Sequence, residues 1–458
     1  MLLLLSLLAV AANLNLSHHI LVFHGFGSKS NLLLFAPLME ELLDRGNRVT
    51  SILFSSVGIE HENLTEIVLP TDTSVLTARL SNLVMQKPGF SFQTFLVLIQ
   101  IVFYSGLGDR RLWSLLYDAA TWDPEPFALE SVRPPEVQEL IRQKPKVDAV
   151  VTQWATGALF AEVFDCPVVL FSPNGPFLTE GTNLLINRNL QPLLWAPFIE
   201  PMSLMQQLAN NFIGFAMDHL LGHINHQFYL HQAAFLQKEL GLVVRSADLV
   251  LQERVSVMLA ASHPVTHGAW PFLPNIIEVG GLHLRPARQL PNNLQMVLDN
   301  ATRGAVLVSF GSTIKAEEMS LQMVKLFLEV FRMLELPVIW QWEGVLVDPP
   351  ANLLTMPWLP QQDLLAHPNL KVLVTHGGLG SLTEAIQHKV VVVGIPLTSD
   401  QQPNMLRAER LGYGIKVDWN SLSVDQLLAA ITKALRDPEM QQNVEKVRSW
   451  VFKGKNLF

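Results

Sequence analysis

Residues 374–386 read VTHGGLGSLTEAI, an apolar run that gives way to a glycine-rich turn and then to a helical pattern. This order is typical of a strand, a turn and a helix in a parallel sheet. The backbone amides of Gly377 to Ser381 would lie at the helix N-terminus, where unpaired N–H groups and the helix dipole attract anions. His376 could add an N–H donor or a positive charge. Because the turn lacks the Lys-Ser/Thr of a P-loop, we expect it to hold a diphosphate and not a magnesium triphosphate.

Two interpretations of Ser381 and Glu384 are open on local grounds. Ser381 could be the N-cap of the helix, with Glu384 reaching back to it in a capping box. Glu384 could instead accept hydrogen bonds from ribose hydroxyls, because a carboxylate accepts from two donors at once. The two interpretations are compatible.

Two more pairs of residues flank this element. Trp358 could be a core aromatic residue, or it could stack on a base while Gln361 hydrogen-bonds the edge of that base. Asp400 and Gln401 follow the apolar run at 390–397, at the carboxyl end of the next expected strand. They form either a solvated turn or a site for sugar hydroxyls.

Both halves of the chain alternate short β-branched apolar runs with helical patterns. Such alternation indicates parallel sheets with right-handed crossovers, so we predict an α/β fold of two facing Rossmann-like, doubly wound domains. The predicted domains are residues 18–265 and 292–458, joined by a linker rich in Pro and Gly at 266–291. Ligands of such folds bind at the carboxyl ends of the strands, which predicts a site in the cleft between the domains.

The composition of the chain limits the classes of function that it can have. The chain has 458 residues, of which 49% are hydrophobic and 16% charged, enough for two cores. A formal net charge of −8 gives no electrostatic footprint for nucleic acid, which we exclude as a partner. The single cysteine, Cys166, excludes a disulfide within the chain.

Two apolar segments bear on localisation. Residues 1–12 are too short to span a bilayer and end in small residues, which favours a signal peptide; the alternative is the start of a buried strand. Residues 90–108 are interrupted by Gln93 and Gln100, which favours a core helix over a helix on a membrane surface. We therefore expect the endoplasmic reticulum lumen or the secretory pathway, with no membrane anchor in this chain.

The stretch from SFGS at 309–312 to Gln401 resembles the signature of the UDP-glycosyltransferases, inverting enzymes with the GT-B fold. Residues 35–50 and 168–173 resemble the animal branch, which comprises UDP-glucuronosyl- and UDP-glucosyltransferases. The resemblance implies that Trp358 stacks on uracil with Gln361 nearby, and that Glu384 holds the ribose. The remaining donor-binding residues would be Ser312, His376, Gly378 and Ser381 for the diphosphate, and Asp400 with Gln401 for the transferred sugar.

The resemblance also implies that a catalytic dyad is missing. Members of the animal branch place a histidine in the first glycine-rich loop as the base, and an aspartate in the N-terminal domain orients it. Asn31 and Gln153 occupy these positions here. An amide cannot act as a general base, and loss of base catalysis costs about 10²–10⁴-fold in rate. His24 is the only titratable candidate nearby, and it is more readily interpreted as a loop histidine.

We therefore predict inverting transfer of a hexosyl group from a UDP-sugar to a small lipophilic acceptor (hydroxyl, phenol or carboxylate), with a role in detoxification. The UDP-sugar is a co-substrate, and neither a metal nor another cofactor is expected. The apolar N-terminal domain, including 90–108 and 212–230, would form the acceptor cleft.

Two rival functions are a UDP-sugar-binding pseudoenzyme and a UDP-sugar epimerase. The epimerase is disfavoured by the predicted signal peptide and by the donor signature. The sequence leaves open the sugar, the acceptor, association with a membrane through the N-terminal domain, and a homodimer.

Overall fold

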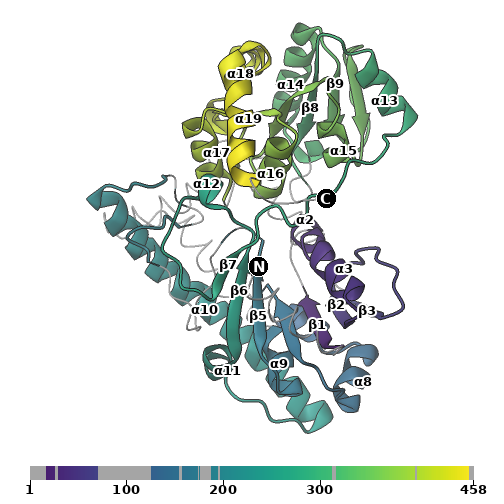
Figure 1. The fold of residues 1–458 in the computed structure, drawn as a ribbon, viewed down its shortest axis with the longest axis vertical. Coiled ribbons are helices and arrows are strands. Elements are labelled where there is room, and N and C mark those ends of the chain that lie inside the picture. The colour runs from purple at the N-terminus through teal and green to yellow at the C-terminus, as the bar shows by residue number, and fades with distance from the viewer. Residues whose placement is uncertain are drawn as a thin grey trace.

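The computed structural model describes residues 17–25, 29–70, 125–153, 157–173, 175, 187–193, 196, 198–311, 316–397 and 400–452. The predicted signal peptide at 1–12, the apolar segment at 90–108 and Ser312 lie outside these ranges. The described residues form two lobes, each built on a parallel sheet with helices packed against it (Figure 1).

The N-terminal lobe holds a seven-stranded parallel sheet in the order β3-β2-β1-β4-β5-β6-β7. Its central strands are buried on both faces by two hydrophobic clusters, as expected for a sheet covered by helices on each side, whereas β3 at the edge is partly exposed. The strands are β1 His19–His24, β2 Arg48–Leu53, β3 Leu64–Val68, β4 Ala149–Thr152, β5 Val168–Ser172, β6 Val255–Ala260 and β7 Ile276–Glu278. The helices are α2 Lys29–Leu33, α3 Ala36–Asp44, α7 Glu125–Glu130, α8 Pro135–Gln143, α9 Ala158–Phe164, α10 Leu204–Leu240, α11 Ala247–Arg254 and α12 Pro264–His267.

The C-terminal lobe holds a six-stranded parallel sheet in the order β10-β9-β8-β11-β12-β13. The strands are β8 Ala305–Ser309, β9 Val338–Gln341, β10 Leu353–Met356, β11 Leu370–Thr375, β12 Val391–Gly394 and β13 Gly414–Lys416. The helices are α13 Asn292–Asp299, α14 Leu321–Leu334, α15 Gln361–Leu365, α16 Leu379–Gln387, α17 Gln401–Arg410, α18 Val424–Arg436 and α19 Pro438–Phe452, with short 3₁₀ turns at Ala316–Glu318 and Trp419–Ser421.

The order of strands reverses at one point in each sheet, between β1 and β4 and between β8 and β11. Phe23 is in register with Thr152 in the first sheet, and Ser309 with Thr375 in the second. Because ligands of doubly wound folds bind beyond the carboxyl ends of the strands at such switch points, each sheet has one place where a ligand is expected. His24 and Gln153 lie at the carboxyl ends of the first pair of strands, and His376 and Gly378 follow β11 of the second pair.

The predicted linker at 266–291 is partly built into the N-terminal sheet. Ile276 and Ile277 of β7 pair in register with Met258 and Leu259 of β6, so the sheet continues past residue 265. Further along, Gly281 lies against the end of α19: a Cβ at this glycine would sit 3.1 Å from Phe452 Cε1. The last helix of the C-terminal lobe thereby contacts the segment that leaves the N-terminal lobe.

Among the described residues, no helix combines the length and the apolar character needed to cross a bilayer.

Candidate functional site

Gln361, Ser381 and Glu384 form a hydrogen-bonded cluster at the edge of the C-terminal sheet. Gln361 is the first residue of α15, and the other two lie on one face of α16, three positions apart. Gln361 Nε2 donates to Glu384 Oε2 at 2.7 Å and to Ser381 Oγ at 3.0 Å. The sequence named all three residues but did not predict that they bond one another.

The capping-box interpretation of Ser381 is wrong. Helix α16 begins at Leu379, and its N-cap is Gly378, which offers no side chain for a cap. Ser381 therefore lies inside the first turn, where its hydroxyl and the Glu384 carboxylate both accept from Gln361 and neither caps the helix.

The environment of Glu384 favours its neutral form. The side chain is 12% exposed, and burial raises its pKa to about 7. Hydrogen bonds from Gln361 and Gln362, together with the charge of Arg285, offset part of this effect. Its second oxygen, Oε1, lies 3.7 Å from Nε2 of His283, a residue of the linker that the sequence interpretation did not select.

The glycine-rich turn after β11 is shaped by close packing. Gly377 has φ +86, and a Cβ there would sit 2.7 Å from Met405 Cγ. A Cβ at Gly378 would sit 2.5 Å from His376 Nε2, and one at Gly311, after β8, would sit 2.8 Å from His376 Cε1. Glycine at these positions lets the backbone approach the histidine ring from both switch-point strands.

His376 is neutral at physiological pH in the free chain. Burial lowers its pKa to about 4, so the ring offers an N–H donor and not a positive charge. Its Nδ1 lies 3.2 Å from Thr375 Oγ1, and its Nε2 faces Gly378. An anion held at the turn would be bound first by N–H groups.

Asp400 and Gln401 are buried at the start of α17, with 7% and 6% exposure, so the solvated-turn interpretation is wrong. Asn404 Nδ2 donates to Asp400 Oδ2 at 2.6 Å and to the Gly377 carbonyl at 3.1 Å. Gln401 Oε1 accepts from the Leu397 amide at 2.8 Å. Asn404, which the sequence interpretation missed, therefore ties α17 to the glycine-rich turn.

Trp358 is 52% exposed, so it is not a core aromatic residue. It lies after β10, two residues before the N-cap of α15, close in sequence to Gln361. An exposed indole at the carboxyl edge of a sheet offers a face on which a base can stack.

The N-terminal switch point brings together His24, which is the last residue of β1 and not a loop histidine, and Gln153, directly after β4. His24 has no exposure, and neither ring nitrogen has a hydrogen-bond partner among the described residues. Its ring packs against Phe35 and Phe54, with centroids 5.0 and 5.4 Å away, and burial lowers its pKa to about 3. Asn31 lies partly buried in α2.

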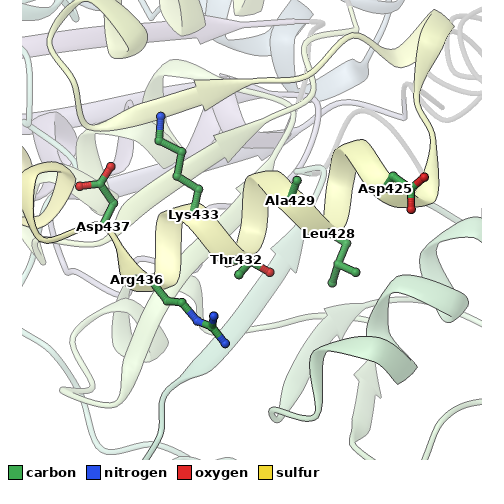
Figure 2. Close-up of a pocket in the computed structure, with 7 residues that line it drawn as sticks. All are labelled: Asp425, Leu428, Ala429, Thr432, Lys433, Arg436 and Asp437. Atoms are coloured by element: carbon green, nitrogen blue, oxygen red, sulfur yellow. The ribbon is translucent and has the colours of Figure 1, made fainter.

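A separate hollow lies on the outer face of α18 (Figure 2). All its lining residues belong to this helix and its C-cap, and Lys433 and Arg436 point away from each other in the view. One helix face cannot enclose a ligand, so the hollow adds nothing to the site. Within the described part of the chain, no three His, Cys, Asp or Glu side chains gather as metal ligands would.

Comparison with known proteins assigns the family. The sequence model of one protein family, the UDP-glucoronosyl and UDP-glucosyl transferases, matches residues 137–454. The chain belongs to this family. Human UDP-glucuronosyltransferase 2B10 is 28% identical over 437 residues, which are 90% of this chain and 76% of that protein. The UDP-glycosyltransferase UGT5 of Dactylopius coccus is 30% identical over 318 residues, 68% of this chain and 60% of its relative.

Solved glycosyltransferases share the two-lobed architecture. The spinosyn forosaminyltransferase SpnP superposes with a TM-score of 0.59 at 13% identity, covering 96% of both chains. A UDP-glucose:anthocyanidin 3-O-glucosyltransferase in complex with UDP gives 0.55 at 13% identity, covering 95% of this chain and 94% of that one. The predicted family and the predicted GT-B fold are both confirmed, and the family is one of transferases.

Proposed function

We propose that this UDP-glycosyltransferase transfers a hexosyl group from a UDP-sugar to a small lipophilic acceptor, with inversion at the sugar carbon. The observation that carries the proposal is the cluster of Gln361, Ser381 and Glu384 beside the glycine-rich turn, in a chain of this family. Exposed Trp358 would take the uracil, Glu384 the ribose, and the turn with His376 the diphosphate. The UDP-sugar is the co-substrate, and we propose no metal or other cofactor.

In the proposed mechanism, the rate enhancement comes mainly from stabilising UDP as the leaving group. N–H donors aimed at a developing negative charge lower the barrier most where water is excluded. The amides at the start of α16 and the neutral His376 ring would stabilise UDP as the bond to the sugar breaks. Buried Asp400 and Gln401, at the start of α17, would orient the sugar.

The N-terminal switch point supports a reaction with little base catalysis. A general base works best when its pKa lies near the operating pH, whereas the pKa of His24 is about 3 and its ring is enclosed by Phe35 and Phe54. Gln153 and Asn31 carry amides. We therefore propose that acceptors with acidic groups, such as phenols and carboxylates, react faster than aliphatic alcohols.

The same observation favours one alternative, a UDP-sugar-binding protein that does not turn over. The alternative keeps the donor site of the C-terminal lobe and assigns no reaction to the N-terminal switch point. Both functions require UDP binding, and only the first releases UDP from a UDP-sugar.

The deciding experiment measures UDP release by the purified full chain with UDP-glucose and with UDP-glucuronate. A nitrophenol is compared with an aliphatic alcohol of similar size as acceptor, and Glu384→Ala is the donor-site control. Acceptor-dependent release that this variant abolishes supports the transferase. UDP binding without release with any acceptor supports the alternative, and absence of UDP binding refutes both.

A further inference from the structure

The segment that follows β7 is fixed onto α15 by side chains from both partners. Arg285 binds Asp363 through two hydrogen bonds, Nη1 to Oδ1 at 2.7 Å and Nη2 to Oδ2 at 2.8 Å. Gln362 Nε2 donates to the His283 carbonyl at 3.1 Å, and its Oε1 accepts from the Arg285 amide at 3.2 Å. A bidentate ion pair and a two-sided amide contact hold this part of the backbone in one place.

His283 thereby places its ring beside the candidate donor site. The side chain keeps 12% of its exposure, and Nε2 is buried without a hydrogen-bond partner among the described residues. The ring also makes a hydrogen bond with the backbone of Gly380. Glu384 Oε1 lies 3.7 Å from Nε2, just beyond hydrogen-bond length.

Glu384 presents its second oxygen, Oε1, to the ring of His283. Oε2 accepts from Gln361, whereas Oε1 has the orphaned Nε2 opposite it. Nε2 of His283 is a buried polar atom without a partner, which is costly, and a small rotation of the carboxyl group would bring Oε1 within hydrogen-bond reach of it. An ionised carboxylate only accepts, so a hydrogen bond that fixes the carboxyl plane requires the neutral ring to hold its proton on Nε2.

We propose that His283 is a positioning residue of the nucleotide site: it hydrogen-bonds Glu384 Oε1 when a nucleotide binds and so orients Glu384 toward the ribose hydroxyls. The inference rests on the proposed function, because it requires that Glu384 bind the ribose. Gln361 and His283 then hold the two oxygens of one carboxyl group, one from α15 and one from the connection between the lobes. The connection is part of the donor site and is not only a tether.

The charged groups around the pair are few. Arg285 of the connection and Asp363 of α15 are the charged groups that act on Glu384, and they bind each other. Burial lowers the pKa of His283 to about 4 and raises that of Glu384 to about 7, so at pH 8 the ring is neutral and the carboxyl group is mostly ionised. A ribose hydroxyl that donates a hydrogen bond to Glu384 stabilises the ionised carboxylate relative to the neutral carboxyl group.

The test measures affinity for UDP and for 2′,3′-dideoxy-UDP at pH 8 by calorimetry on the full chain. The variants are His283→Ala, which removes the ring, and His283→Gln, whose amide can still donate at a similar reach. His61→Ala, in the loop before β3 of the N-terminal lobe, is the control for loss of a histidine. Thermal unfolding checks that each variant is folded.

We expect His283→Ala to weaken the affinity for UDP about tenfold, the loss typical of a hydrogen bond to a charged group. His283→Gln should recover most of this loss, and neither variant should change the affinity for the dideoxy nucleotide. An equal loss for both nucleotides, or no loss for UDP, overturns the inference while the proposed function stands. Failure of the unmodified chain to bind UDP overturns the proposed function itself, and the inference with it.

If His283→Ala fails to fold, the comparison of His283→Gln with the unmodified chain decides whether the inference holds. The inference then requires that the Gln variant bind UDP within about threefold of the unmodified chain. It also requires a different pH dependence of affinity between pH 6 and 8, because the pKa of Glu384 depends on which group donates to its carboxylate. An unchanged pH dependence overturns it.

Discussion

Arg407 of α17 donates through Nη2 to Glu200 Oε2 at 2.8 Å, across the boundary between the two lobes. Arg407 is 4% exposed, and its guanidinium lies over the ring of Trp270, 5.4 Å from the centroid. Arg410, three residues further along the helix, donates to Glu200 Oε1 at 2.6 Å. Figure 1 places α17 next to α12 where the lobes meet. One carboxylate therefore joins the N-terminal lobe to the helix whose first residue, Gln401, belongs to the candidate sugar site.

Glu200→Ala should destabilise the chain by about 3 kcal/mol, because it leaves the buried Arg407 guanidinium without its carboxylate. The measurement is urea unfolding at pH 7, taking the first transition if the lobes unfold separately. Glu445→Ala, which breaks the well-exposed pair with Lys389, is the control and should change nothing measurable. Equal midpoints for Glu200→Ala and the unmodified chain would show that the cluster does not stabilise the contact between the lobes.

UDP-glucose should bind more tightly as pH rises through about 7, the pKa of Glu384. Below this pH the carboxyl holds a proton that must leave before it accepts two hydroxyl donors. If only the ionised form binds, affinity at pH 5.5 should be about 30-fold weaker than at pH 8. UDP-glucose has no terminal phosphate that titrates near pH 6, and the ring of His376 stays neutral in this range in the free chain.

Calorimetry across this pH range is the measurement, and Glu384→Gln is the control, since its amide does not titrate. The profile of Glu384→Gln should be flat. A profile for the unmodified chain that is equally flat would contradict the assignment of Glu384 to the ribose.

The sequence was sufficient for the architecture because the alternation of apolar runs and helical patterns is local information. It also named Gln361 and Glu384 one by one as candidate site residues. It could not place them in contact, because that contact depends on how α15 and α16 pack. Ser381 misled the local analysis, since a serine followed three residues later by glutamate is typical of a capping box, whereas the helix begins at Leu379.

Other features had no local signal at all. His283 lies in a stretch interpreted only as a linker, and its position depends on Gln362, which holds its backbone from a distant segment. The enclosure of His24 by Phe35 and Phe54 is a tertiary contact between the end of β1 and two later segments. A titratable residue in a predicted loop therefore gave no information about its own burial.

His24→Leu should stabilise the chain in acid and leave turnover unchanged. The pKa of His24 is about 3 in the folded chain and near 6.5 when unfolded, so the unfolded chain binds the extra proton and stability falls as pH drops below 6.5. At pH 5 this penalty is about 2 kcal/mol, and leucine removes it. The measurement is the free energy of unfolding at pH 7.5 and pH 5. A fall in turnover of about 10²-fold or more would instead identify His24 as a general base.

Gly378→Ala should abolish tight UDP binding and keep the fold. The new Cβ would sit 2.5 Å from His376 Nε2, closer than carbon and nitrogen approach without a bond, so the ring must move away from the turn. Gly380→Ala, two residues further along, is the matched control, since its Cβ would meet only His283 Nε2 at 3.9 Å. Inside a helix this second change should add up to about 1 kcal/mol of stability. UDP affinity that falls at least tenfold more for Gly378→Ala than for Gly380→Ala would support the anion site at this turn, and equal affinities would place the diphosphate elsewhere.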